Sequence, residues 1–165
     1  MERLPHSKSC FVCGARNPIG LNLRFETDGK IVQCRFVPRP EHNGFLNVTH
    51  GGLIATILDE VMVWACAIRT GKFSYSAEMT VRYVAPTKTA QEVVAIGELL
   101  ENKRDKLFFV KGELRLQDGA VLATSTGKYI PIRDLDYRVL IGDFEGTPEQ
   151  FDKFLPKVPP HSIQQ

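Results

Sequence analysis

The chain contains 165 residues, of which 43% are hydrophobic and 24% are charged. This composition is typical of one folded globular domain and excludes an intrinsically disordered, collagenous or disulfide-scaffold protein. The formal net charge is +2, from 21 Lys and Arg against 19 Asp and Glu, so we expect no nucleic-acid partner. We expect no membrane span either, because Asp59 and Glu60 interrupt the longest apolar run.

The first twenty residues are predicted to form an irregular lead-in. They contain four residues that interrupt regular structure, namely Pro5, Gly14, Pro18 and Gly20. They lack the apolar stretch of a secretory signal. The four cysteines of the chain favour a reducing compartment, and we therefore expect a cytoplasmic location.

Apolar and polar residues alternate over 21–26 and over 31–37, on either side of Asp28-Gly29. This pattern predicts a β-hairpin. A loop over 38–44 follows. After Gly71 the alternation returns in four segments, which we expect to form a meander of strands over 76–85, 92–101, 108–116 and 121–130.

Between these strands, a helix is predicted from about Gly51 to Thr70, and its apolar residues face almost every direction. Such a helix is enclosed by protein. We therefore predict a single α+β domain over 21–132, in which an antiparallel sheet wraps around one long central helix. The remaining residues, 133–165, form a C-terminal extension with a short helix that begins at Thr147-Pro148. We expect this extension to cover a dimer surface or the mouth of a pocket.

Two glycines, Gly51 and Gly52, open the long helix directly after His50. The first turn of a helix carries unpaired N–H groups with partial positive charge, and glycine allows another atom to approach them closely. This arrangement can hold a developing oxyanion. The alternative is that the glycines only permit close packing of helix on sheet, and that His50 only binds backbone groups.

Two acidic residues, Asp59 and Glu60, lie inside the apolar helix. A carboxylate is rarely buried without a role, so at least one of them should face a cleft that solvent reaches. The alternative is that both are solvated at one wet edge of the helix, which fits Glu60 better than Asp59.

Gly51 and Asp59 are eight residues apart, which is about 12 Å along a helix. A reacting carbonyl must lie about 3 Å from both its oxyanion donor and its nucleophile, so one helix cannot supply both. Two antiparallel helices related by a two-fold axis can, because each Gly51 then faces the Asp59 of the other chain. If this segment is catalytic, the enzyme is at least a homodimer.

The segment from His50 to Glu60 resembles the hotdog-fold thioesterases, in particular the phenylacetate-pathway-type (PaaI-like) branch of the hydroxybenzoyl-CoA thioesterase superfamily. Three further segments resemble parts of the same family, and together the resemblance covers about residues 10–132: the lead-in Cys10 to Leu21, the strand Ser76 to Pro86 and the last strand Gly119 to Gly127.

The resemblance implies a homodimer, with a possible dimer of dimers, that hydrolyses an acyl-CoA thioester at its interface. It implies Gly51 as the backbone donor to the thioester carbonyl, Asp59 as nucleophile or general base, and His50 as a positioning group. It further implies that substrate contacts come from Asn43, Gly52 and Ser76, with Asn47 as an alternative to Asn43. No cofactor is expected.

Other functions remain open at this stage. A hotdog module can bind acyl-CoA or another apolar ligand without catalysis, and hydratases share the fold. Cys10-x-x-Cys13 is half of a zinc site, but His6 and Cys34 have no convincing spacing for the other ligands, so no metal is expected. Larger side chains near the helix, and cations that could meet phosphates, are unassigned: Phe45, Met62, Trp64, Arg69, Lys72, Arg82 and Lys88.

Overall fold

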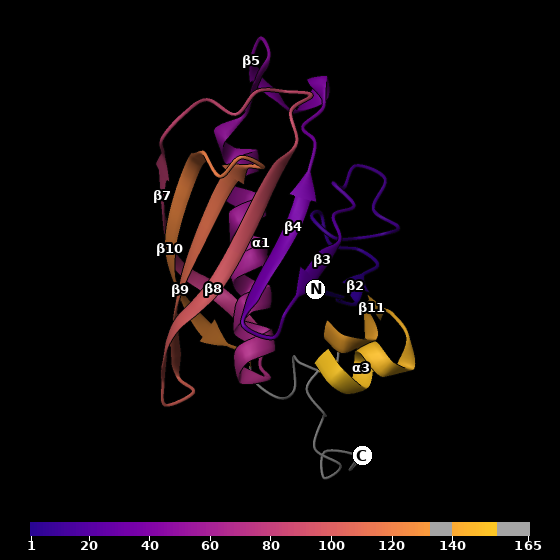
Figure 1. Cartoon of the computed structure of the whole chain (residues 1–165). Coiled ribbons are helices and arrows are strands. Elements are labelled where there is room, and N and C mark those ends of the chain that lie inside the picture. The colour runs from indigo at the N-terminus through magenta and orange to yellow at the C-terminus, as the bar shows by residue number, and fades with distance from the viewer. Residues whose placement is uncertain (133–139, 155–165) are drawn as a thin grey trace.

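The computed structural model describes residues 1–132 and 140–154. A seven-stranded antiparallel sheet curves around one long helix, α1 (Gly51–Thr70), as Figure 1 shows. The predicted α+β architecture is therefore confirmed. In spatial order the strands are β1 (Glu2–Arg3), β3 (Phe25–Thr27), β4 (Ile31–Phe36), β8 (Val93–Lys103), β9 (Leu107–Leu116), β10 (Val121–Pro131) and β7 (Ser74–Tyr83).

The other elements lie outside this sheet. A short 3-10 turn (Pro40–His42) leads into a small hairpin of β5 (Asn43–Phe45) and β6 (Val48–Thr49) just before α1. β2 (His6–Ser7) pairs with β11 (Phe144–Glu145), and α3 (Pro148–Phe154) follows.

The predicted helix is confirmed at both ends: His50 is its N-cap and Gly71, with a φ of 70°, is its C-cap. The predicted hairpin is shorter than expected, since its first strand covers only 25–27. The reason is that Leu21 and Leu23 donate their N–H groups to the carbonyls of Phe11 and Val12. The lead-in, expected to be irregular, also contains β1 and β2.

The four strands after α1 do not form the predicted meander. β7 pairs only with β10, whereas β8 lies between β4 and β9. Burial explains this order. The first half of β8 is almost completely buried, as suits a central strand, and most side chains of β7 are exposed, as suits an edge.

α1 lies directly on the centre of the sheet because two glycines face it. Gly97 of β8 and Gly112 of β9 are opposite each other in register. A Cβ at residue 97 would overlap the backbone carbonyl of Val61, and one at residue 112 would lie 3.2 Å from Leu58. The missing side chains therefore form the groove that receives the helix.

On length and composition alone, α1 could cross a membrane, since an 18-residue window of it has a mean hydropathy of 1.7. The two acidic residues thus do not exclude a span as the sequence suggested. The core helix of a folded domain has the same composition, however, and the sheet packs along this one. Its buried residues are Ile54, Ile57, Leu58, Val61, Met62, Trp64, Ala65, Cys66 and Ala67.

The C-terminal helix is confirmed with its predicted cap, because Thr147 and Gln150 exchange side-chain to backbone hydrogen bonds. The described part of the extension, 140–154, packs against the lead-in and the far half of α1, where the ring of Phe144 lies 5.7 Å from that of Trp64. Figure 1 places it at the end of the molecule opposite the β5–β6 hairpin. The rest of the extension lies outside the described residues.

We expect Gly97→Ala to lower the free energy of unfolding by about 1–3 kcal/mol or more, because the added methyl group meets backbone that cannot rotate away. Thermal or urea unfolding measures the change. Gly142→Ala is the matched control, since a Cβ there meets nothing within 4 Å. Equal stability of the two variants would contradict the close packing of helix and sheet at this point.

Candidate active site

The start of α1 presents one unpaired donor. The Nδ1 atom of His50 accepts the N–H of Gly52 at 2.9 Å. Within residues 1–132 and 140–154, no group of the chain accepts the N–H of Gly51. Gly51 therefore offers the free, partly positive N–H group expected of an oxyanion donor, whereas that of Gly52 is already used.

Both glycines are also needed for packing. The hydroxyl of Tyr83, at the end of β7, donates to the carbonyl of Gly51 at 2.7 Å, and a Cβ at residue 51 would lie 3.3 Å from the Tyr83 ring. A Cβ at residue 52 would lie 3.0 Å from Nδ1 of His50. The two glycines therefore do permit close packing, as the alternative interpretation held. This packing still leaves the N–H of Gly51 without an acceptor among the described residues.

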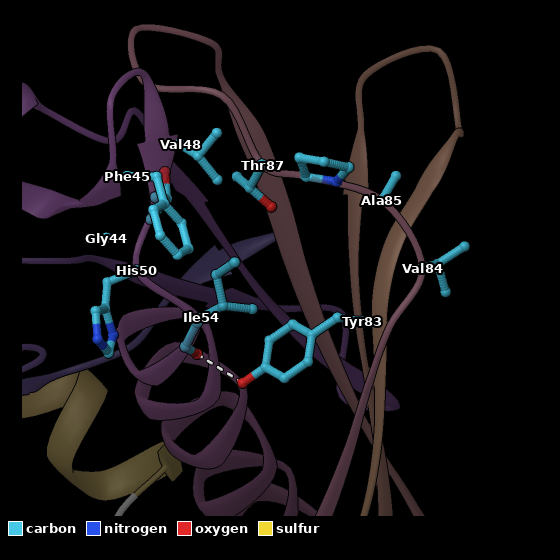
Figure 2. Close-up of a pocket in the computed structure, with 12 residues that line it drawn as sticks. Gly44, Phe45, Val48, His50, Ile54, Tyr83, Val84, Ala85 and Thr87 are labelled. Carbon is cyan, nitrogen blue, oxygen red and sulfur yellow. Dashed lines mark hydrogen bonds between the residues drawn. The ribbon is translucent and has the colours of Figure 1, made fainter.

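A hollow of about 700 Å³ lies over the first turn of α1. Figure 2 shows Tyr83 and Ile54 on its floor, with the β5–β6 hairpin on one side and the segment after β7 on the other. The side chain of Phe45, at the tip of the hairpin, is 81% exposed. The lining is mostly apolar, and none of the described residues 140–154 contributes to it. Whether the extension covers this mouth stays a prediction, because its residues 133–139 and 155–165 lie outside the described part of the chain.

A second hollow, of about 660 Å³, lies on the other side of His50. It brings together three of the predicted site residues, Asn43, His50 and Gly52. The side-chain oxygen of Asn43 is buried there, and none of the described residues donates to it. Asn47 instead occupies the turn of the hairpin with a φ of 60°, where its carbonyl accepts the N–H of Thr89. Asn43, and not Asn47, therefore lies beside His50 and Gly52, where the amide contact to the substrate was predicted.

Asp59 lies two turns further along α1 and faces the edge of the sheet. Its Oδ1 atom accepts two hydrogen bonds, from the hydroxyl of Ser76 at 2.7 Å and from that of Tyr129 at 2.8 Å. No donor among the described residues reaches its Oδ2 atom. One carboxylate oxygen is thus fixed by β7 and β10, and the other is available to a water or a substrate.

A β-bulge makes this contact possible. β7 and β10 pair Glu78 with Lys128 and then Ser76 with Tyr129, so Ala77 is the extra residue. Strict alternation of side chains placed Ser76 on the same face as Glu78. The bulge moves Ser76 to the helix side, opposite Tyr129, where both hydroxyls reach Asp59.

Sequence reasoning missed Tyr129, which is completely buried. A buried tyrosine hydroxyl almost always has a partner. Gly127, two residues earlier, makes room for the ring, because a Cβ at residue 127 would overlap it. Burial and the neighbouring Asp59 raise the pKa of Tyr129 far above its usual value. Tyr129 therefore remains a hydrogen-bond donor at neutral pH.

Glu60 is half-buried and lines a separate hollow next to the lead-in. Its carboxyl group faces the lead-in, with Oε1 3.5 Å from the Sγ atom of Cys10, and burial raises the pKa of Glu60 to about 8. The two neighbouring acids of α1 thus have different surroundings. Asp59 points to the sheet edge, and Glu60 points to Cys10 and Cys13.

The unassigned residues mostly have structural partners. Trp64 and Met62 belong to the core, while Phe45 lines the first hollow. Lys72 pairs with Asp105 at 3.1 Å, and Arg69 reaches the carbonyl of Gly29 at 3.3 Å.

The comparisons with known proteins find similarity to thioesterases. The sequence model of the Thioesterase superfamily matches residues 46–123, which include α1 and most residues that line the first hollow. Acyl-coenzyme A thioesterase 13 of Homo sapiens is 29% identical over 82 residues, or 48% of this chain and 57% of that protein. The chain thus matches little more than half the length of this relative.

Solved structures agree on the fold. A crystal structure described as a thioesterase superfamily protein has a TM-score of 0.69 and 26% identity, covering 74% of this chain and 63% of the other. The PaaI protein from the phenylacetic acid degradation operon of E. coli has a TM-score of 0.62 and 16% identity, covering 68% of this chain and 81% of the other. The predicted resemblance to the hotdog-fold thioesterases is confirmed, and at 16% identity the PaaI structure shows that its fold is shared.

The His50 cap yields a test of stability. We expect His50→Ala to destabilise the protein by about 0.5–2 kcal/mol, because the N–H of Gly52 loses its acceptor. His50→Asn should recover most of this loss, since asparagine is among the best N-caps. Urea unfolding of the three proteins makes the comparison. If His50→Asn were as unstable as His50→Ala, the cap would not be the structural role of this side chain.

Proposed function

From this resemblance to hotdog-fold thioesterases, we propose that the chain is a thioester hydrolase that acts on acyl-coenzyme A. The observation that carries the proposal is the pair of free groups on α1: the unpaired N–H of Gly51 and the unbonded Oδ2 of Asp59. The first suits an electrophilic carbonyl oxygen. The second suits a nucleophile or a base. The name of the human relative supports the acyl-CoA class.

In the proposed reaction, the thioester carbonyl accepts the N–H of Gly51, which stabilises the negative charge that develops on its oxygen. In one route Asp59 removes a proton from water as the water attacks the carbonyl carbon, the C–S bond breaks, and the thiolate of coenzyme A takes up that proton and leaves as the thiol. In the other route Asp59 attacks the carbonyl carbon and expels the thiolate, and water then hydrolyses the anhydride on Asp59, which frees the acid and supplies the proton for the thiol. Ser76 fixes Asp59 from β7, and Tyr129 does so from β10. His50 and Gly52 shape the start of the helix, and the buried oxygen of Asn43 accepts a donor of the substrate.

The active unit is a homodimer, which can pair further into a dimer of dimers. Two features support it. Gly51 and Asp59 are about 12 Å apart on one helix, so they must come from two chains to meet at one carbonyl. β7 is a ten-residue edge strand with one unpaired side, and long exposed edges readily pair with another strand. Its exposed Tyr75 and Tyr83 would be covered.

The alternative of a binding module without catalysis explains the apolar hollow but not Asp59. Two hydroxyls orient this carboxylate, a precision that binding an apolar chain does not need. A hydratase would pair a histidine with an acid. Here Nδ1 of His50 is occupied by the N–H of Gly52, so hydrolysis fits better. The reducing environment that four free cysteines favour is that of the cytoplasm.

We expect Asp59→Asn to lower kcat/KM for acyl-CoA hydrolysis by about 10²–10⁴-fold, because the amide can neither attack nor accept a proton at neutral pH. Release of free coenzyme A thiol from a panel of acyl-CoA substrates measures the rate. Glu78→Gln is the matched control: this acid also lies on the β7 side, but it pairs with Lys128 at 2.7 Å and should leave the rate unchanged. Undiminished turnover of Asp59→Asn would eliminate the mechanism, and no turnover on any substrate would favour the binding module.

A further inference from the structure

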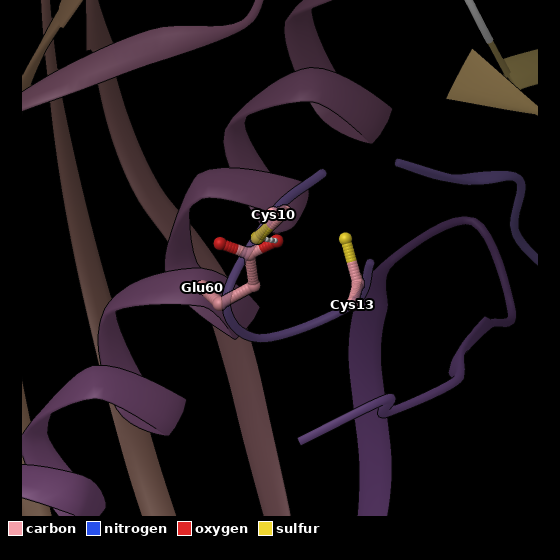
Figure 3. A group of neighbouring side chains, drawn as sticks. All are labelled: Cys10, Cys13 and Glu60. Carbon is pink, nitrogen blue, oxygen red and sulfur yellow. Dashed lines mark hydrogen bonds between the residues drawn. The ribbon is translucent and has the colours of Figure 1, made fainter. Parts of the chain in front are cut away.

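We propose that Cys10, Cys13 and Glu60 form a zinc site that fastens the N-terminal lead-in to α1. Figure 3 shows the three side chains converging, two from the lead-in loop and one from the helix. The sequence alone identified only the two cysteines. The third ligand comes from α1, far away along the chain, which is why spacing could not reveal it.

The distances fit a tetrahedral ion. One ligand atom from each residue lies within 4.8 Å of the other two. With Zn–S of about 2.3 Å and Zn–O of about 2.1 Å, tetrahedral angles separate sulfur and oxygen by about 3.6 Å. The Sγ of Cys10 and Oε1 of Glu60 are 3.5 Å apart. An ion at this point therefore needs only small side-chain rotations.

The loop that carries the cysteines is shaped around the sulfur of Cys10. The N–H of Val12 points at Sγ of Cys10 at 3.2 Å, and the N–H of Gly14 donates to the Cys10 carbonyl at 2.9 Å. A Cβ at residue 14 would overlap that carbonyl, so only glycine permits this tight turn. A sulfur that receives a backbone N–H is stabilised as a thiolate, which is the form that binds a metal.

The surroundings of the Glu60 carboxyl group give an independent reason to expect a cation at this site. Among the ion pairs of the described residues, none includes Glu60, whose half-buried carboxyl group lies beside two thiols. A carboxylate that is partly removed from water without a cationic partner is costly. A divalent cation provides the missing positive charge. Two thiolates with one carboxylate favour zinc over the hard cations Mg²⁺ and Ca²⁺, which prefer oxygen ligands alone.

The fourth coordination position is left for water. A hollow of about 300 Å³ lies against the three side chains, and it is also lined by Ser7, Ser9 and Asp143. Because Glu60 directly follows Asp59 on α1, the ion holds this part of the helix against the lead-in. The site does not depend on the proposed hydrolysis.

Metal analysis of the purified full chain tests the proposal. The protein is stripped with a chelator under reducing conditions, reloaded with Zn²⁺ and washed, and zinc is quantified by mass spectrometry. We expect one zinc per chain and a higher melting temperature in the loaded protein. Substitution by Co²⁺ should give a sulfur-to-cobalt charge-transfer band and the intense visible bands of a tetrahedral site.

Variants assign the ligands. Cys13→Ser should lose the zinc and the charge-transfer band, and Glu60→Gln should bind zinc at least tenfold more weakly. Cys66→Ala is the control, because Cys66 is also a buried cysteine but lies outside the cluster, and it should retain the metal. Retention of metal by Cys13→Ser, or the absence of stoichiometric zinc in the wild type, would overturn the site. So would a disulfide between Cys10 and Cys13 in the native, aerobically purified chain, since oxidised sulfurs are not available as thiolates.

Discussion

The rigidity of α1 determines the chemistry that this chain can perform. Gly51 and Asp59 belong to one straight helix, which holds the free N–H and the free carboxylate oxygen about 12 Å apart. No side-chain rotation closes that distance. A reaction that needs both groups at one carbonyl must therefore use two helices, and the fold, the edge strand and the proposed dimer all follow from this separation.

The sheet holds α1 in place and fixes the position of the Asp59 carboxylate. Gly97 and Gly112 let the backbone of α1 rest on the central strands, so the helix cannot slide. At the sheet edge, the bulge at Ala77 brings Ser76 opposite Tyr129, and their hydroxyls hold one oxygen of Asp59. The carboxylate is thereby held beside β7, the edge strand of the sheet. The same sheet thus fixes the carboxylate in position and provides the edge where a second copy can join.

Patterns of short range were enough to predict much of this structure. The enclosed helix and its two ends, the turn at Asp28-Gly29 and the capping box at Thr147 all depend on neighbouring residues, and each is confirmed. The strand order was wrong because pairing of β8 with β4 is a contact between distant segments. The contact between Ser76 and Asp59 could not be predicted, because a bulge breaks the alternation of side chains along β7. The contact between Glu60 and Cys10 could not be predicted either, since only the folded lead-in brings the two together.

The central claim is that each active site uses Gly51 of one chain and Asp59 of the other. A mixed dimer in which each chain carries a substitution at a different one of these two residues tests it most directly. Gly51→Pro removes the donor and suits the first helical position, and the extended His50 (φ −60°, ψ 130°) is compatible with a following proline. Because a Cβ at residue 51 lies 3.3 Å from the Tyr83 ring, thermal unfolding first checks that the Gly51→Pro parent is folded. This chain is co-expressed with Asp59→Asn under a different affinity tag, and the mixed dimer is isolated. If each site uses both chains, the mixed dimer holds one intact site and shows about half the wild-type rate, while both parents are inactive. A mixed dimer as inactive as its parents would contradict the account.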